Sequence, residues 1–352
     1  MTSPSEGAAT DTPAGDAAPV EAPPPPHVLW RDWREDELIP TYEARDMELV
    51  GVRRHPEEID PEVGDDTLVA TLVRRNPPHH DRAVLYLHGW NDYFFQTHVA
   101  TWWDELGYDF YALDLRRYGR SLRAGMMPGF IEDLREYDLE IDAAVDEVSS
   151  SHDGLVLYAH STGGLIGSLW ADGHPHTLAG LVLNSPWIDL QGSALVRALV
   201  PPIVRGLATR ASTFVLPLPD NGFYARTLDA LSDGTWTYDP ELKRSPSNPT
   251  RSGWLTAVMA GHDRVSAGLA IDCPILMVTS TRSDFRRRWS DDLLGVDSVL
   301  DVSRLAAKAH CLGPHLTLVR LEGAVHDVVL SPRTVRDRFH DEIRRWEGAY
   351  LR

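Results

Sequence analysis

The hydrophobic pattern of this chain changes at about residue 83. Before it, residues 49–52 and 67–73 are short apolar runs separated by a turn-rich stretch, which predicts an antiparallel pair at a sheet edge. After it, apolar runs of strand length alternate with stretches of helical periodicity. Strands are predicted at residues 83–88, 110–115, 154–160, 178–184, 274–278 and 316–321, and helices at residues 97–106, 132–149, 303–310 and 334–350.

This alternation predicts the α/β fold class. We expect a doubly wound, mostly parallel sheet with helices on both faces and right-handed crossovers. In such sheets the chemistry gathers at the carboxyl ends of the strands. His88, Asp114 and Ser161 fall at such ends.

The strand pattern is interrupted between residues 190 and 271. This stretch has no clear strand, so it is predicted to be a cap insertion over the carboxyl edge, dividing a core of residues 28–189 and 272–352. Residues 193–208 are apolar at helical spacing, with Pro201 and Pro202 expected to interrupt them. Nearer the amino terminus, residues 30–43 are charged with scattered aromatics and predict a short helix or coil on the surface.

The first 27 residues are rich in Pro and Ala and predict a disordered tail. They lack the basic start and apolar centre of a secretion signal. Elsewhere there is no apolar run of the roughly 18 residues that a membrane span needs, so stable membrane insertion is not expected. Two cysteines, Cys273 and Cys311, cannot form a disulfide framework and are expected to be reduced. These features predict a cytoplasmic protein.

The length and net charge of the chain limit the number of domains and the kinds of partner that we expect. The chain has 352 residues, of which 43% are hydrophobic, enough for one large α/β domain with an insertion. Its net charge is −18, from 52 acidic and 34 basic residues. Such a surface repels phosphate backbones, so nucleic-acid binding is not expected. Nothing in the sequence fixes the oligomeric state.

Ser161 is the candidate nucleophile. It lies between the predicted strand at 154–160 and a helix-like stretch, and small residues flank it at Ala159 and Gly163. A serine at a sharp strand-to-helix turn takes an unfavourable φ and exposes its hydroxyl, which requires small neighbours. The same turn directs the Thr162 N–H toward the place where an oxyanion would form.

A second amide is expected from the loop after the strand at 83–88. Here Gly89 permits a tight turn, and the Trp90 N–H can point into the site. Together with Thr162 it predicts an oxyanion hole with two donors.

The base and the acid are expected after later strands. His326 follows the last predicted strand and would lie at the same sheet edge as Ser161. Two aspartates compete for the role of the acid. Treating residues 281–296 as a polar loop insertion favours Asp297, immediately before the next helix, with Asp284 as the alternative.

Two other groups of residues are interpreted as structural. The stretch from Asp114 to Ser121 contains three arginines and Gly119, and it is expected to order loops near the site through ion pairs and a tight turn. The pairs His79-His80 and His174-Pro175-His176 lack Cys or carboxylate ligands at useful spacing, so we interpret both as solvent-exposed turns rather than metal sites.

With these residues in view, the chain resembles the α/β-hydrolases, and among them the monoacylglycerol lipase and lysophospholipase-like serine hydrolases. The resemblance covers about residues 82–345. It is carried by these residues: His88-Gly89, Asp114 with Gly119-Arg120-Ser121, His160 to Gly164, Asp297 to Leu300 and Gly323 to His326. Ala159 stands where the family pattern has Gly, and residues 90–93 are bulkier than is common after His-Gly in lipases.

The resemblance implies hydrolysis of carboxylic esters through an acyl-serine, without a metal or an organic cofactor. It maps the nucleophile, acid and base onto Ser161, Asp297 and His326, and the oxyanion amides onto Trp90 and Thr162. The expected partner is a small-molecule ester, such as a monoacylglycerol or an ester of a short- to medium-chain acid.

The apolar segments 195–207 and 214–218 of the insertion would line the acyl pocket. A proline-type aminopeptidase on the same fold is the alternative. It would need a carboxylate in the insertion to hold a free amine, for which Asp220, Asp229 and Glu241 are candidates. A catalytically inactive binding protein is the third reading.

Overall fold

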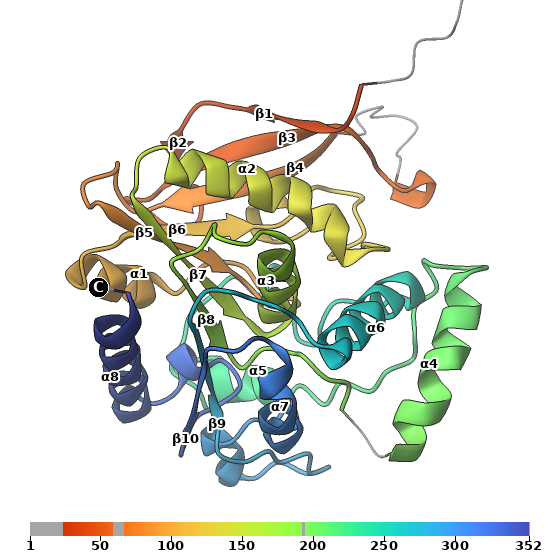
Figure 1. The fold of residues 1–352 in the computed structure, drawn as a ribbon. Helices are drawn as coiled ribbons and strands as arrows, with labels where there is room; N and C mark the ends of the chain where they lie inside the picture. Colours follow the sequence, from red (N-terminus) through yellow and green to blue (C-terminus); the bar gives the residue numbers. More distant parts are fainter. Residues whose placement is uncertain (1–23, 59–66, 192–193, 352) are drawn as a thin grey trace, which may run out of the picture.

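A twisted sheet forms the centre of the protein (Figure 1). The computed structural model describes residues 24–58, 67–191 and 194–351. The tail predicted at residues 1–27 lies outside the described residues as far as residue 23. Within the described ranges the strands are β1 (His27–Trp30), β2 (Arg34–Glu35), β3 (Glu43–Arg53), β4 (Thr67–Arg74), β5 (Arg82–Leu87), β6 (Asp109–Asp114), β7 (Gly154–His160), β8 (Gly180–Asn184), β9 (Ile275–Ser280) and β10 (Leu316–Leu321).

The strand order is β1-β3-β4-β6-β5-β7-β8-β9-β10, with β2 paired to β3. Strands β6, β5, β7, β8, β9 and β10 run parallel to one another, whereas β1, β2, β3 and β4 form antiparallel pairs at one edge. The predicted doubly wound, mostly parallel sheet is therefore confirmed.

Helices cover both faces of the sheet. They are α1 (Thr97–Glu105), α2 (Asp138–Ser149), α3 (Ser161–Gly173), α4 (Ala194–Ala208), α5 (Phe223–Leu228), α6 (Ser252–Ala267), α7 (Val302–Lys308) and α8 (Arg333–Tyr350). Figure 1 shows α1 and α8 on one side of the sheet, with α2 and α3 on the other. Along β5, Val84 and Tyr86 pack in the core under α1 and α8, whereas Leu85 and Leu87 pack in the core under α2 and α3. Because alternate side chains point to opposite faces, a strand covered on both sides is apolar throughout.

The edge at β1 refines one prediction. Residues 30–43 were expected to form a helix or coil, and residues 31–33 and 36–42 are indeed irregular, but Trp30 ends β1, Arg34–Glu35 form β2, and both strands pair with β3. Val28 lies opposite Leu49 and Trp30 opposite Met47. Strands of four and two residues carry too little alternation to stand out in a charged sequence, and the exposed edge of β3 supplies the pairing that stabilises them.

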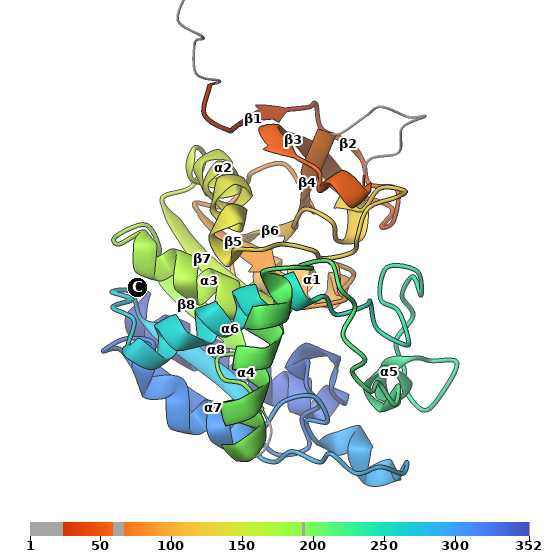
Figure 2. The same cartoon turned by 90° about the vertical axis from the view of Figure 1, so that its right-hand side faces the viewer.

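Residues 190–271, which we call the insertion, lie between β8 and β9 and contain α4, α5 and α6. Figure 2 shows α4 beside α6, and the two helices are in contact. Pro201 and Pro202 were expected to interrupt α4, but the helix continues through them. Two prolines remove two N–H donors. The helix therefore keeps its course with two fewer backbone hydrogen bonds.

Candidate active site

Ser161 lies at a strained turn between β7 and α3. Its φ is +52°, in the left-handed region that a serine rarely adopts. The turn is crowded as well, because a Cβ added to Gly163 would lie 2.3 Å from the His88 carbonyl oxygen. Both features are those of a nucleophile elbow, in which the hydroxyl is raised above the sheet edge.

The structure holds Ala159 close to Gly167 of the facing helix. A Cβ added to Gly167 of α3 would lie 3.5 Å from the Ala159 Cβ, which is ordinary van der Waals contact, and 3.1 Å from a methyl carbon of Leu157, which is tight. The alanine at the first position of the elbow is fully buried here, and the turn keeps the positive φ of Ser161.

Ser161, His326 and Asp297 form a continuous hydrogen-bonded row. The Ser161 Oγ lies 2.9 Å from the His326 Nε2, and the His326 Nδ1 lies 2.9 Å from an Asp297 oxygen. His326 is only 3% exposed and Asp297 is fully buried. The three predicted residues, from three loops at the carboxyl edge, are thus brought together in the order that nucleophilic catalysis requires.

The geometry separates Asp297 from Asp284. The second oxygen of Asp297 accepts the backbone N–H groups of Val299 and Leu300, each at 2.8 Å, which fixes the carboxylate beneath the imidazole. Asp284 instead pairs with Arg286 at 2.6 Å, and this arginine lowers the pKa of the Asp284 carboxyl. Asp297, and not Asp284, contacts His326.

Two amides are available beside the hydroxyl. Thr162 is in the first turn of α3, where a backbone N–H has no acceptor within the helix. The loop after β5 approaches closely, since a Cβ added to Gly89 would lie 3.0 Å from the Ser161 Cβ. Trp90 follows this glycine, and both Trp90 and Thr162 line the same cavity as Ser161 and His326. The two residues predicted to supply the oxyanion amides therefore line the cavity together with the serine.

The loop after β5 is bound tightly to the insertion. Lys243 Nζ lies 2.7 Å from an Asp92 oxygen, and both side chains are buried. Asn91, at φ +53°, donates its side-chain amide to the Arg244 carbonyl at 2.9 Å and accepts the Asn248 N–H at 3.1 Å. Sequence reasoning missed this attachment, which we call the loop clamp (residues 91, 92, 243, 244 and 248). The bulky residues after His88-Gly89 were its only signal.

A further buried carboxylate, that of Asp327, lies next to His326 in the sequence. Asp327 is fully buried and accepts the Asn184 side-chain amide at 2.6 Å. Burial raises the pKa of the Asp327 carboxyl, but electrostatic interactions with His160 and with the Lys243 ammonium, together with the Asn184 hydrogen bond, outweigh it and lower the pKa overall. Burial lowers the pKa of the neighbouring His160.

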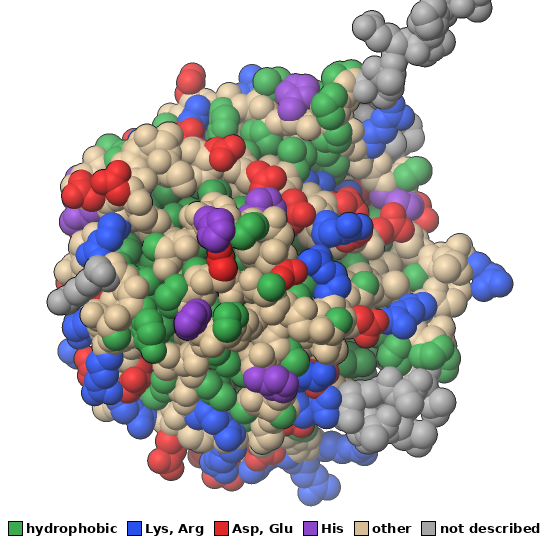
Figure 3. Space-filling view, in the orientation of Figure 1, with side chains coloured by type: hydrophobic (Ala, Val, Ile, Leu, Met, Phe, Trp, Pro, Cys, Tyr) green, Lys and Arg blue, Asp and Glu red, His purple; other side chains and the backbone are tan. Residues whose placement is uncertain are grey.

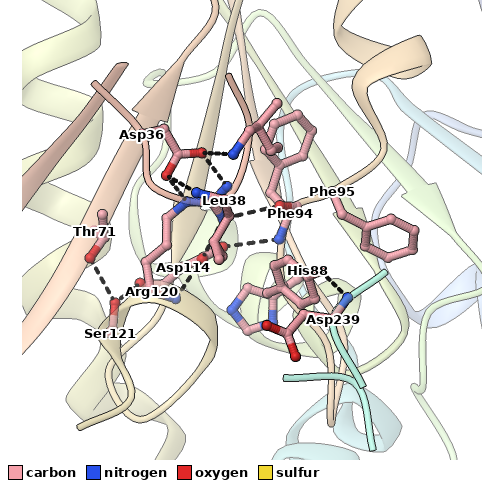
Figure 4. A network of polar contacts seen from close by, with 12 residues as sticks. Asp36, Leu38, Thr71, His88, Phe94, Phe95, Asp114, Arg120, Ser121 and Asp239 are labelled. Carbon is pink, nitrogen blue, oxygen red and sulfur yellow. Dashed lines mark hydrogen bonds and ion pairs between the residues drawn. The ribbon is translucent and has the colours of Figure 1, made fainter. Parts of the chain in front are cut away.

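The loop after β6 is held by ion pairs, as interpreted from the sequence. Arg120 bonds Asp114 at 2.8 Å and Asp36 at 2.6 Å, and all three side chains are buried (Figure 4). Gly119 has φ +45°, and a Cβ there would lie 2.3 Å from an Asp114 oxygen. Asp114 also accepts the Phe94 N–H at 3.0 Å, so this cluster supports the loop after β5.

A cavity of about 1040 Å³ opens above Ser161. Trp90 and Trp254 pack against each other in its wall, with ring centroids 3.9 Å apart and ring planes tilted by 39°. The ring centroid of Trp187 lies 5.9 Å from that of Trp254. The insertion contributes much of the remaining lining, including Val200, Val215, Leu216, Leu218, Phe223 and Tyr224. Such a mostly apolar cavity with a few polar groups fits a small organic ligand.

The segments predicted to line an acyl pocket are only partly in this cavity. Residues 200, 215, 216 and 218 line it, whereas Leu207 and Phe214 do not. Phe214 is 48% exposed. The side chains of residues 195–199 lie outside the described part. The hydrophobic pattern of the sequence indicated segments that contribute to the cavity lining. It did not indicate which side chains of each segment point into the cavity.

The carboxylates considered for an amine-binding role divide in the same way. Asp220 lines the cavity, and its oxygens accept the N–H groups of Gly222 and Ser247, each at 2.8 Å. Asp229 and Glu241 do not line the cavity. Of the three, Asp220 alone is positioned to meet a ligand.

Two groups of side chains have metal-ligand chemistry within the described ranges. Asp92, His160 and Asp327 lie together, but the Lys243 ammonium already neutralises Asp92. The other group contains His79 and His80 and lies at the opposite edge of the sheet. His174 and His176 pair with separate carboxylates, Asp142 and Asp272. The two cysteines are unpaired.

The surface bears intermixed acidic and basic side chains on the face seen in Figure 3. Among the described residues, no helix is both long enough and apolar enough to cross a membrane.

Comparisons with solved structures agree with this fold. The monoacylglycerol lipase of Paleococcus ferrophilus is 16% identical, with a TM-score of 0.55 over 77% of this chain and 97% of its own. A soluble variant of monoglyceride lipase from Saccharomyces cerevisiae, in complex with a substrate analog, is 15% identical, with a TM-score of 0.56 over 95% and 100%. A thermophilic esterase from Thermogutta terrifontis is 17% identical, with a TM-score of 0.51 over 82% and 96%. At these identities the likeness establishes the fold.

A family model gives the closer assignment. No curated protein matches the chain significantly in sequence. The model described as serine aminopeptidase, S33, matches residues 78–283, more than half of the chain. The match includes Trp90, Ser161 and Thr162 and ends before Asp297 and His326. The chain therefore belongs to the serine aminopeptidase S33 family of α/β-hydrolases.

Proposed function

We propose that this protein is a serine hydrolase that cleaves carboxylic esters through an acyl-serine intermediate. The observation that carries the proposal is the row from Ser161 through His326 to Asp297, with both contacts at 2.9 Å. A serine hydroxyl needs an adjacent base to become a nucleophile, and the base needs an acid to hold its tautomer.

In the proposed reaction, the His326 Nε2 accepts the Ser161 proton as the oxygen attacks the ester carbonyl. Asp297 holds the Nδ1–H of His326 and stabilises the imidazolium that forms. The negative charge on the carbonyl oxygen is stabilised by the N–H groups of Trp90 and Thr162, each worth about 3 kcal/mol in such sites. His326 then protonates the leaving alcohol, and a water molecule repeats the sequence to release the acid.

The lining of the cavity supports an ester with an apolar acyl part. Leu216, Leu218 and the adjacent tryptophans Trp90 and Trp254 offer contact to a hydrocarbon or aromatic group. Monoacylglycerols and esters of short- to medium-chain acids are the proposed substrate class. The proposed reaction uses no metal and no organic cofactor. We also propose that the protein is located in the cytoplasm.

We also propose that the insertion acts as a cap over the site, dividing the core into residues 28–189 and 272–352. The loop clamp supports this role, because it joins Lys243 and Asn248 of the insertion directly to Asn91 and Asp92 beside the oxyanion amide. A cap fixed at this point would position the acyl part of a substrate relative to Ser161.

The test is labelling with a fluorophosphonate, which reacts with activated serines. We expect the wild type to be labelled and Ser161→Ala not to be. Ser247→Ala is the matched control, since Ser247 lines the same cavity, and it should label normally. Labelling that persists in Ser161→Ala would reject the nucleophile, and a wild type that is never labelled would favour an inactive binding protein.

An aminopeptidase is the second candidate, favoured by the place of Asp220 in the cavity lining. Nitrophenyl esters of graded chain length and anilides of free amino acids would be compared. We expect the esters to be cleaved faster. Faster cleavage of the anilides, abolished by Asp220→Asn, would replace the esterase proposal.

A further inference from the structure

Two histidines and two carboxylates meet at the amino ends of the parallel strands, opposite the edge that bears Ser161. His79 and His80 precede β5, Asp104 is in the last turn of α1, and Asp109 is the first residue of β6. Ligand atoms of all four residues lie within 4.8 Å of one another. This group could not be recognised in the sequence, because the two carboxylates follow the two histidines by 24 residues or more.

Both imidazoles point at one oxygen atom. The Nε2 of His79 lies 2.9 Å from the Asp104 Oδ1, and the Nε2 of His80 lies 3.3 Å from the same Oδ1. The other Asp104 oxygen is held by Arg75 at 2.9 Å, which leaves Oδ1 directed at the histidines. Two nitrogen donors and one oxygen donor therefore converge before any ion is added.

The turn that carries the histidines is fixed by Asp109. One oxygen of Asp109 accepts the backbone N–H groups of His79 and His80, at 2.8 and 3.0 Å. Its other oxygen lies 2.7 Å from the His79 Nδ1, and this nitrogen also makes a hydrogen bond with the Pro77 carbonyl oxygen at 3.2 Å. Asp109 is buried, with its side chain only 3% exposed, so this support is rigid.

His79 therefore has a carboxylate oxygen at each ring nitrogen. A neutral imidazole has one N–H and one lone pair, so it would direct its lone pair at one of the two carboxylates. The arrangement is favourable only if a second positive species, a proton or a metal ion, lies on the Nε2 side. A carboxylate on the Nδ1 of a histidine whose Nε2 binds a metal is the usual support of a metal site.

We propose that His79 Nε2, His80 Nε2 and Asp104 Oδ1 bind a divalent transition-metal ion, with Zn²⁺ the best fit, while Asp109 orients His79. Zinc takes imidazole nitrogen and carboxylate oxygen in tetrahedral sites. The side chains of His79 and His80 are 43% and 28% exposed, so water can reach a fourth position. The nearby Arg75 charge opposes the ion, so we expect micromolar rather than nanomolar affinity.

The proposed ion would join the turn before β5, the end of α1 and the start of β6. It would stabilise the fold at this edge, far from the ester chemistry, and it does not depend on the proposed function.

Calorimetric titration of the metal-free full chain with Zn²⁺ at neutral pH tests the proposal. We expect one saturable site per chain, lost in His79→Gln and in Asp104→Asn. His174→Gln is the matched control, because His174, in the turn after α3, also pairs with an aspartate, Asp142 of α2. It should bind Zn²⁺ normally. Cys311→Ser controls for the other donor pair, in which Cys311 lies 3.5 Å from the His310 Nε2.

Zn²⁺ should also raise the Tm of the wild type by at least about 4 °C at a concentration of about 100 times Kd. It should leave the Tm of His79→Gln unchanged. Binding should weaken below about pH 6.5, where protons compete for the imidazoles. The proposal is overturned if the wild type shows no saturable site, or if His79→Gln and Asp104→Asn bind as well as the wild type while Cys311→Ser does not.

Discussion

His326 and His79 lie at the two opposite ends of the parallel strands of one sheet, and the surroundings of their Nδ1 atoms are alike. Each has a carboxylate at its Nδ1, Asp297 at 2.9 Å and Asp109 at 2.7 Å. The groups at Nε2 differ. His326 faces the Ser161 hydroxyl at 2.9 Å, whereas His79 faces the Asp104 carboxylate at 2.9 Å.

This difference decides what each ring can do. A hydroxyl can give its proton to a neutral imidazole, so the His326 arrangement suits a base. A carboxylate has no proton to give and instead attracts a cation, so the His79 arrangement suits a metal or a second proton. Exposure separates them further, since His326 is 3% exposed and the His79 side chain 43%. A histidine with an aspartate behind it is therefore not by itself a sign of catalysis.

The strongest test of this contrast is to change the two Nδ1 partners. In Asp297→Asn the amide can donate to Nδ1, which would leave the Nε2–H pointing at Ser161. We expect turnover of a nitrophenyl ester to fall by up to about four orders of magnitude, with circular dichroism unchanged. In Asp109→Asn turnover should stay near the wild-type value.

Asp284→Asn serves as the control at the same edge. Since Asp284 is paired with Arg286 and not with His326, its loss should change turnover only mildly. A severe defect in Asp284→Asn together with a mild one in Asp297→Asn would show that the acid is misassigned.

A smaller effect is expected from Lys243→Met, which breaks the loop clamp. The variant leaves Asp92 buried without its partner, which should lower the free energy of unfolding by about 3–5 kcal/mol. Because the clamp holds the loop that bears Trp90, we expect kcat to fall about 10- to 100-fold, less than the loss of a whole oxyanion donor, with a smaller change in KM. Urea unfolding and steady-state kinetics measure both.

The double variant Asp92→Asn with Lys243→Met should recover part of the stability, because no unpaired charge remains. An unchanged kcat in Lys243→Met, in protein that is fully folded, would separate the clamp from the oxyanion hole.

A still smaller effect is expected on substrate preference when a residue of the cavity lining is replaced. Leu216→Ala enlarges the cavity and should shift preference toward longer acyl chains several-fold, since each methylene is worth about 0.8 kcal/mol. Phe214→Ala, outside the cavity lining, should leave the profile of kcat/KM against chain length unchanged. Equal shifts in both variants would mean that the effect does not arise from the lining.

The smallest effect concerns the pH dependence of stability in metal-free protein. Burial lowers the pKa of His79, but the Pro77 carbonyl and the two carboxylates together raise it above its ordinary value of 6.5. A raised folded-state pKa stabilises the protein below pH 6.5, and this contribution is lost as pH rises through the folded pKa. The Tm of wild type minus that of His79→Gln should therefore decrease between pH 6 and pH 8, with chelator present, while turnover of the two proteins stays alike. A difference that grows with pH would contradict the assigned direction.

The parallel core could be predicted because its strands are continuous apolar runs. Ser161 could be placed because it directly follows such a run, and His326 because it lies in the short loop after the last one. Parallel strands bring their ends to one edge. Asp297 needed the added assumption that residues 281–296 are a loop. The structure supplies the reason, since a bridge between Ser283 and Asp297 closes that loop.

Three of the features that were missed depend on distant contacts. Strands β1 and β2 are stabilised by pairing with β3 rather than by their own pattern. The loop clamp joins Asn91 to residues 244 and 248, and the His79 group joins a turn to two later elements. Helix α6 could have been found, because Trp254, Leu255, Val258 and Met259 repeat at helical spacing.

The ion pairs of the loop after β6 have a practical consequence for the boundaries of a minimal folding unit. The family match begins at residue 78, yet Arg120 is paired with Asp36 and Arg117 with Glu58, all buried. A protein trimmed to start at residue 78 would lose both Asp36 and Glu58. Arg120 would keep Asp114 as a partner, whereas Arg117 would lose the carboxylate with which it pairs. Removing one partner of a buried ion pair typically costs about 3–5 kcal/mol, a large part of the stability of many domains. Shortened versions for crystallisation or domain transplantation should therefore begin before Asp36, outside the range that family similarity alone would suggest.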